Sequence, residues 1–203
     1  MPRDGLLVDF GGVLTTNVFD AFAEFCRAEG LAPDTVRDRF MGDPRARGLL
    51  GELETGQIDE AGFEPRFAAL LGLDEAEGLV DRLFAGMVPE PAMLDAVRAA
   101  RGAGVRTGLV SNSWGLHRYD HGSLGELFDT LVISGEVGIR KPSPEIYSLA
   151  AERLGRAPER IVFVDDLPGN LKPARAIGMA TVLHRDAATT VAELEQLLGV
   201  SLR

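Results

Sequence analysis

The chain has 203 residues, of which 45% are hydrophobic and 26% are charged. This length and balance predict one folded domain, or one domain with an insertion, and exclude a disulfide-stapled miniprotein and a disordered chain. The 31 acidic and 21 basic residues give a formal charge of −10, so we expect no nucleic acid partner. The single cysteine, Cys26, allows no internal disulfide and fits a cytoplasmic protein.

Neither a signal peptide nor a membrane span is predicted. The first apolar stretch, residues 5–8, is interrupted by Asp9 before it reaches the length of a signal-peptide core. The longest apolar runs have the length of strands, far below the ~18 residues of a membrane helix.

Short apolar runs alternate with longer segments of helical spacing, which is typical of parallel strands joined by crossover helices. The sequence predicts strands at residues 5–10, 105–110, 130–134, 161–164 and 180–183. It predicts helices at residues 91–101, 144–154, 171–177 and 191–198, with Gly102, Gly155 and Gly178 as stop signals. The expected fold class is α/β, a doubly wound parallel sheet of the Rossmann-like type.

The first crossover is too long for one connection, because about 80 residues separate the first strand from the helix before the second. We expect residues 17–88 to form an inserted helical domain, and residues 1–16 and 89–203 to form the α/β core. Five phenylalanines with helical spacing should supply most of the apolar interior of the insert. They are Phe19, Phe22, Phe25, Phe63 and Phe67.

Polar side chains follow the predicted strands at their carboxyl ends, the edge where doubly wound sheets bind ligands. They are Asp9, Ser111, Asn112, Lys141, Asp165 and Asp166. A carboxylate nucleophile, small donors, one ammonium and a carboxylate pair are what phosphoryl transfer with Mg²⁺ requires. A serine hydrolase is not indicated, because no Gly-x-Ser-x-Gly motif occurs and no histidine at a strand end is placed to serve a serine.

The four ordered motifs resemble the haloacid dehalogenase superfamily, and more narrowly its members with a helical C1-type cap after the first strand. Residues 137–147 and 161–179 look closest to the N-terminal phosphatase domain of soluble epoxide hydrolase. The resemblance implies a Mg²⁺-dependent phosphatase that forms an aspartyl phosphate and acts on a small phosphorylated metabolite. We do not expect epoxide chemistry, because the second domain of that bifunctional enzyme has no counterpart in this chain.

The resemblance also implies a role for each motif that binds the phosphoryl group. Asp9 matches the nucleophile, whose other oxygen contacts Mg²⁺. Ser111 and Asn112 match the residues that hold phosphoryl oxygens through a hydroxyl and backbone N–H groups. Lys141 matches the residue that balances the charge between nucleophile and phosphoryl group. Without the other motifs, an aspartate or a serine after a strand could equally be a turn residue or a helix cap.

The metal ligands implied by the resemblance are Asp9, Asp166 and the backbone carbonyl of Gly11, with Asp165 in support. Two adjacent carboxylates repel each other, and a bound divalent cation removes that cost. Asn170 belongs to the same motif and is expected to orient a loop or a ligand.

Gly11 departs from the phosphatase pattern, which has a second aspartate at this position as general acid and base. Such a group contributes ~10² to 10⁴ in rate, so its loss puts activity in question. A positive φ at Gly11 would explain the glycine in conformational terms. A 2-haloacid dehalogenase without a metal, and a weakly active or non-catalytic phosphoester-binding protein, remain as alternatives.

Three other side chains carry weaker signals. His117 and His121 are four residues apart and could share a zinc ion, although a position at the pocket border or in solvent explains them as well. Trp114 follows the second motif and is expected either to pack in the core or to contact the cap or the substrate. The sequence makes no prediction of the oligomeric state.

Overall fold

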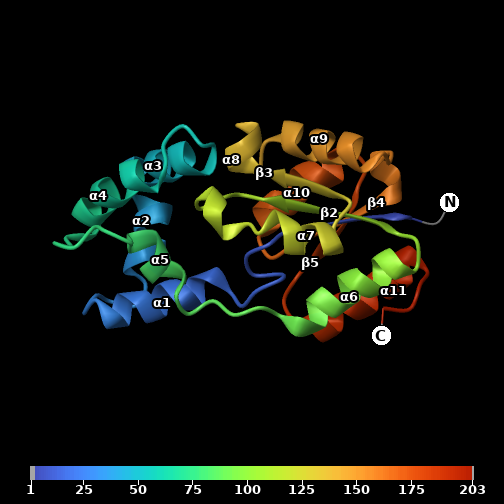
Figure 1. Cartoon of the computed structure of the whole chain (residues 1–203), viewed down its shortest axis with the longest axis horizontal. Coiled ribbons are helices and arrows are strands. Elements are labelled where there is room, and N and C mark those ends of the chain that lie inside the picture. The colour runs from blue at the N-terminus through green and yellow to red at the C-terminus, as the bar shows by residue number, and fades with distance from the viewer. Residues whose placement is uncertain (1–2, 203) are drawn as a thin grey trace.

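A parallel five-stranded sheet forms the centre of the larger lobe in this computed structural model, which describes residues 3–202 (Figure 1). The strands are β1 (Gly5–Val8), β2 (Arg106–Ser111), β3 (Thr130–Ile133), β4 (Ile161–Asp165) and β5 (Ala180–Leu183). Their order is β3-β2-β1-β4-β5 and every neighbouring pair is parallel. All five predicted strands are confirmed, and β1 lies at the centre of the sheet.

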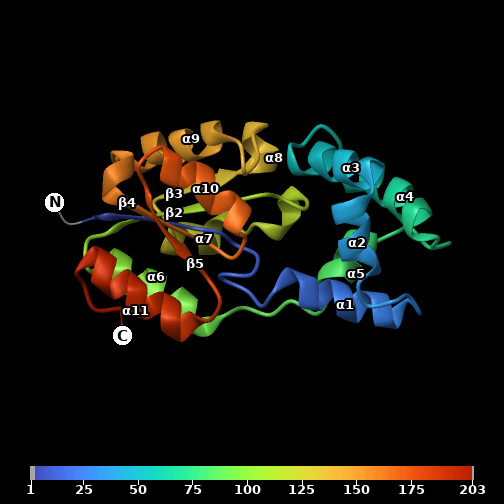
Figure 2. The ribbon, with the colours of Figure 1, turned by 180° about the vertical axis from the view of Figure 1, so that it is seen from behind.

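Helices cover both faces of the sheet (Figures 1 and 2). One face packs against α9 (Pro144–Leu154) and α10 (Pro168–Ala176), and the other against α6 (Pro91–Gly102) and α11 (Ala187–Leu198). The alternation along β1 fits this arrangement, since Leu6 and Val8 join the apolar cluster of one face and Leu7 joins that of the other. A strand that is buried on both faces is a continuous apolar run in the sequence, which is why β1 could be predicted.

The predicted helices of the core are confirmed with changed boundaries. Helix α10 starts before residue 171 because Pro168 occupies its first turn, and α11 starts before residue 191 because the Asp186 side chain caps it. Gly155 ends α9 in the left-handed conformation as expected, whereas Gly102 lies inside the last turn of α6. Among residues 3–202, no helix combines the length and the apolar character needed to cross a membrane.

Four short elements were not predicted. They are the helices α7 (His121–Leu127) and α8 (Ser134–Val137) and the 3₁₀ turns η1 (Leu116–Arg118) and η2 (Pro158–Arg160). Each is too short to show an apolar period in the sequence.

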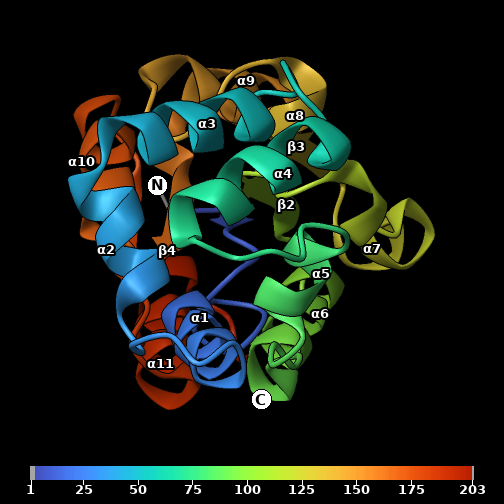
Figure 3. The ribbon, with the colours of Figure 1, turned by 90° about the vertical axis from the view of Figure 1, so that its left-hand side faces the viewer.

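Five helices between β1 and α6 form a smaller lobe, called here the helical insert (residues 18–84). They are α1 (Val18–Ala28), α2 (Thr35–Gly42), α3 (Pro44–Glu54), α4 (Glu60–Leu71) and α5 (Leu79–Phe84). Figure 3, viewed from the side of the insert, shows them in front of the carboxyl ends of the strands. The insert has its own apolar cluster, in which Phe22, Phe25, Phe63 and Phe67 are buried, whereas Phe19 is exposed.

Two connecting segments of the chain join the insert to the core, and they lie side by side. Thr15 and Pro89 form an isolated antiparallel bridge, and the Thr16 N–H donates to the Val88 carbonyl at 2.9 Å. The division into a core of residues 1–16 and 89–203 and a cap of residues 17–88 places its boundaries at this crossing, and we retain it as a proposal.

Trp114, in the loop after β2, packs into the insert rather than into the core. Its ring centroid lies 5.1 Å from that of Phe84 and 5.6 Å from that of Phe22. Aromatic pairs at such distances add to the stabilisation from buried area. A loop of the core is therefore anchored in the apolar cluster of the insert.

Candidate active site

A cavity of about 610 Å³ lies between the carboxyl edge of the sheet and the helical insert. Asp9, Ser111, Asn112, Lys141 and Asp166 line its core side, as the sequence predicted for the ends of parallel strands. Asp165 does not reach the cavity and is fully buried beneath it.

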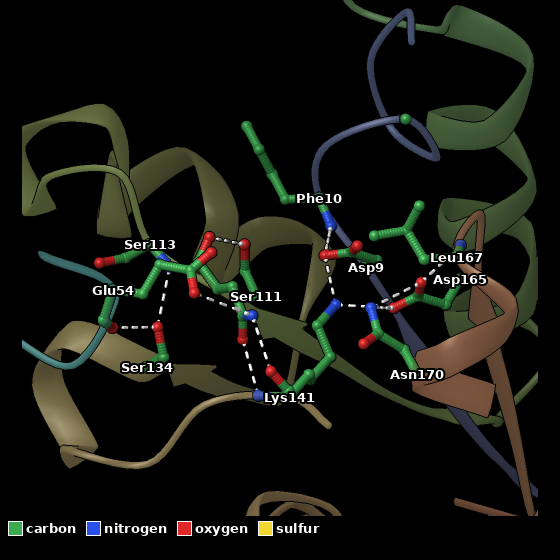
Figure 4. Close-up of polar contacts among 12 residues, drawn as sticks. Asp9, Phe10, Glu54, Ser111, Ser113, Ser134, Lys141, Asp165, Leu167 and Asn170 are labelled. Atoms are coloured by element: carbon green, nitrogen blue, oxygen red, sulfur yellow. Dashed lines mark hydrogen bonds and ion pairs between the residues drawn. The ribbon is translucent and has the colours of Figure 1, made fainter. Parts of the chain in front are cut away.

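The buried ammonium of Lys141 joins two carboxylates (Figure 4). Its Nζ lies 2.7 Å from Asp9 Oδ1 and 2.7 Å from Asp165 Oδ2, and only 2% of the residue is exposed. Burial alone would lower the pKa of Lys141, but the charges of Asp9 and Asp165 outweigh it and raise the pKa. The lysine is therefore a fixed cation next to the predicted nucleophile.

Asp9 is held in one orientation at the end of β1. Its Oδ1 accepts a hydrogen bond from the Phe10 N–H at 2.7 Å in addition to the contact with Lys141. Burial raises the pKa of Asp9 to about 8 against the opposing effect of Lys141. A second cation nearby, in addition to Lys141, would favour the ionised form of Asp9, which is the form that can attack a substrate.

Asp165 has its oxygens occupied by protein donors. Oδ1 accepts from the Leu167 N–H at 2.9 Å and from Asn170 Nδ2 at 3.0 Å, and Oδ2 contacts Lys141. These bonds give Asn170 a role: it orients the Asp165 carboxylate and so acts on the site through Asp165. They also fit a supporting role for Asp165 rather than a direct one.

Asp166 faces the cavity and the turn after β1. Burial, with a smaller effect of Asp165, raises the pKa of Asp166 to about 6. One oxygen each of Asp9, Asp165 and Asp166 lie within 4.8 Å of one another. Within residues 3–202 this is the one cluster of three or more carboxylate, imidazole or thiol groups with metal-binding spacing. Three carboxylates against one ammonium leave an excess of negative charge that a divalent cation would neutralise.

The turn after β1 owes its shape to Gly12 and not to Gly11. Gly12 has a φ of 74°, whereas Gly11 lies outside the positive region, so a positive φ does not explain the glycine at position 11. A Cβ on Gly12 would lie 2.4 Å from Asp166 Oδ2, and one on Gly11 would lie 3.0 Å from Val18 Cγ2. Gly12 thus gives the Asp166 carboxylate its space.

Ser111 and Asn112 differ in what their side chains contact. Ser111 Oγ is 2.8 Å from Tyr119 Oη at the cavity wall. The Asn112 side chain instead holds the backbone of Lys141, accepting from its N–H at 2.8 Å and donating to its carbonyl at 3.0 Å. The amide of Asn112 is therefore used to position the lysine loop, a role that the sequence did not indicate.

Glu54, Arg140 and Tyr119 were missed by the sequence analysis. Glu54, from α3 of the insert, is buried at the cavity and its Oε2 lies 2.6 Å from Arg140 Nη1. Glu54 and Arg140 are 86 residues apart, so no local spacing could have indicated their contact.

The two histidines do not share a metal site. His117 Nδ1 lies 2.9 Å from Glu60 Oε1, and His121 Nε2 lies 2.9 Å from Glu136 Oε1. Both are more than half exposed, which agrees with a position at the pocket border and in solvent.

Comparison with known proteins identifies related sequences. A family model described as haloacid dehalogenase-like hydrolase matches residues 4–178. Bifunctional epoxide hydrolase 2 of Sus scrofa is 39% identical over 54% of this chain and 21% of that protein. The match thus spans about a fifth of that relative. Phosphorylated carbohydrates phosphatase of Thermotoga maritima is 25% identical over 88% of this chain and 83% of that protein.

A solved structure shares the fold. It is an enzyme of the same superfamily from Bacteroides thetaiotaomicron, in complex with magnesium and inorganic phosphate. The two structures have a TM-score of 0.71, with coverage of 90% of this chain and 94% of that one at 22% identity.

We expect Gly12→Ala to destabilise the protein more than Gly30→Ala. Both glycines have φ near +74°, but a Cβ on Gly30 meets no atom within 4 Å, whereas one on Gly12 collides with Asp166. Both variants incur the ~1–2 kcal/mol of a left-handed alanine, and Gly12→Ala adds the collision. The measurement is the free energy of unfolding in urea. Equal losses for the two variants would show that Asp166 moves aside freely.

Proposed function

Because the chain belongs to the haloacid dehalogenase-like hydrolases, we propose that it is a Mg²⁺-dependent phosphatase that hydrolyses a small phosphomonoester through a phosphorylated Asp9. The observation that carries this proposal is the Lys141 ammonium, 2.7 Å from Asp9 and from Asp165 at the floor of a cavity. The matching phosphatase of Thermotoga maritima supports the same activity.

Mg²⁺ is the ion that fits the acidic cluster. Asp9 and Asp166 would hold it together with the Gly11 carbonyl, and Asp165 would support them from below. When bound, the ion neutralises phosphoryl oxygens and keeps the carboxylates ionised. The Bacteroides relative, in complex with magnesium and phosphate, supports this assignment.

The reaction has two displacement steps at phosphorus. Asp9 attacks the phosphoryl group, a P–O bond forms to its carboxylate, and the bond to the alcohol breaks. Water then attacks the phosphorus of the aspartyl phosphate, releases inorganic phosphate and restores Asp9. Lys141 balances the charge shared by Asp9 and the phosphoryl oxygens, and Ser111 and the backbone at Asn112 hold those oxygens.

The wall that the insert adds to the cavity is mostly apolar, although Arg37, Glu54 and Asp81 also line it. Its aromatic and aliphatic side chains include Phe19, Phe22, Phe40, Met41 and Phe84, and Met87 and Trp114 join them from outside the insert. Burial of a nonpolar group against such a wall contributes ~25 cal/mol per Å². We therefore favour a phosphomonoester whose alcohol carries an apolar group over a small polyhydroxylated one.

Asp9→Asn should abolish phosphatase activity, because an amide is a poor nucleophile and a weak metal ligand. With p-nitrophenyl phosphate and Mg²⁺ we expect kcat to fall by more than ~10³-fold, and EDTA to silence the wild type. The control is Asp95→Asn, which removes an exposed carboxylate paired with Arg98. Release of halide from a 2-haloacid without metal would support the dehalogenase instead, and phosphate binding without turnover would support the non-catalytic alternative.

Lys141→Arg should be almost as damaging as Lys141→Ala, because a planar guanidinium does not fit between two carboxylates that are each 2.7 Å from one nitrogen. We expect both variants to lose ~10²-fold or more in kcat. The only other lysine offers a matched control, since Lys172 is exposed and Lys172→Arg should be neutral. Near wild-type kcat in Lys141→Arg would contradict the assigned role.

Mg²⁺ affinity should rise from pH 5 to pH 8. Burial raises the pKa of Asp166 to about 6 and that of Asp9 to about 8, so Mg²⁺ must displace protons at lower pH. Each displaced proton weakens the apparent affinity by up to about tenfold per pH unit below its pKa. Isothermal titration in buffers of different ionisation enthalpy would measure affinity and proton release together. An affinity that is constant over this range would contradict the metal assignment.

A further inference from the structure

A carboxylate from the insert is buried beside the loop that carries the catalytic lysine. Glu54 is the last residue of α3 and only 5% exposed, and its Oε2 lies 2.6 Å from Nη1 of Arg140. Figure 4 shows Glu54 near Ser113 and Ser134, on the far side of Ser111 from Asp9. Within residues 3–202, no hydrogen bond joins Glu54 to Asp9 or to the aspartates after β4.

The partners of Glu54 are the groups that fix Lys141. Arg140 directly precedes Lys141 in the chain, so an ion pair at Arg140 restrains the lysine backbone. Asn112 Nδ2, which donates to the Lys141 carbonyl, lies 3.5 Å from the same Glu54 oxygen. One carboxylate oxygen thus contacts both supports of the loop.

The end of α3 is also seated on the core by its backbone. Ser134 Oγ donates to the Glu54 carbonyl and accepts from the Ser113 N–H at 2.8 Å. Two residues further on, a Cβ on Gly56 would lie 2.5 Å from the Gly135 carbonyl oxygen, so only glycine permits this approach. The Glu54 carboxylate therefore reaches the loop only when the insert lies against α8.

A charged carboxylate at position 54 does not stabilise the folded protein. Burial raises the pKa of Glu54 to about 7, although Arg140 and then Lys141 oppose the shift. The folded state thus favours the neutral form, so the stability of the fold falls as the pH rises from about 4.5 to 7 and the full cost is present above pH 7. Tyr119, the other titratable group that faces Glu54, has its pKa raised by burial and stays neutral.

We propose that Glu54 is a positioning residue: by pairing with Arg140 when the insert rests on the core, it fixes the Lys141 loop beside Asp9. The insert thereby completes the phosphoryl-transfer site as well as the substrate cavity. This role rests on the proposed phosphatase function for its effect on rate, whereas the effect on the loop is measurable without it.

The test compares Glu54→Gln with Arg140→Gln. Each should lower kcat for p-nitrophenyl phosphate by about ten- to a hundredfold, the cost of a displaced catalytic group, with a smaller change in KM. Because the chain has two lysines, ¹⁵N-lysine labelling gives two backbone amide signals. We expect exchange of the Lys141 amide, which donates to Asn112, to accelerate about tenfold in each variant, with Lys172 unchanged.

Two controls separate this role from general disruption. Glu52→Gln removes an ion pair with Arg66 on the same helix, away from the core, and should change neither kcat nor the exchange of Lys141. The double variant of Glu54 and Arg140 should lose far less than the product of the two single losses, because the two residues share one ion pair. The melting temperature of Glu54→Gln at pH 8 should not fall, since the variant removes a buried charge.

Three results would overturn the proposal. Unchanged exchange of Lys141 in Glu54→Gln would show that the ion pair does not hold the loop. Additive losses in the double variant would show that the two residues act separately. A loss confined to alkyl phosphates in Glu54→Gln, absent in Arg140→Gln, would make Glu54 the proton donor instead. An inactive wild type would refute the phosphatase function alone, because the exchange measurement still decides the role of Glu54.

Discussion

The site depends on one buried ammonium, Lys141, between the carboxylates of Asp9 and Asp165. Burying three carboxylates at one edge of a sheet is costly, because each loses hydration and repels the others. Lys141 offsets part of this cost and leaves a remaining negative charge that a divalent cation fits. The parallel sheet makes the arrangement possible, since β1 and β4 are neighbours, Asp9 follows β1 and Asp165 ends β4.

The lysine is supported from two sides. From the core, the Asn112 side chain bonds both the N–H and the carbonyl of Lys141. From the insert, Glu54 contacts Arg140 next to it. Trp114 strengthens the second connection, because a loop of the core is packed into the aromatic cluster of the insert. The insert is thus bound to the core at the loops that follow β2 and β3, which are the loops the proposed chemistry uses.

The features that could be predicted from the sequence are those with a local apolar pattern and the polar residues that follow the strands. Apolar runs such as residues 161–164 revealed the strands, and the residues after them were brought together because parallel strands end at one edge. The family match confirms the resemblance of the ordered motifs. Glu54 and Arg140 could not be predicted in the same way, because a contact between two lobes leaves no period and no spacing in the chain. The left-handed backbone at Gly12 was not predicted either, because the sequence does not fix which glycine of a pair takes a positive φ.

The glycine at position 11 lies next to the apolar wall of the cavity, and we relate the two features. A side chain at Gly11 would begin 3.0 Å from Val18, at the start of α1 and beside the apolar lining of the cavity. A carboxylate placed there would start against an apolar side chain, where loss of hydration is costly. Gly11 avoids this cost and admits the apolar contact, while giving up the acid that would protonate the alcohol. On the proposed mechanism the leaving alcohol then takes its proton from water in the cavity. On this mechanism the chemical step would favour acidic alcohols, and the proposed contact with the wall would favour apolar ones.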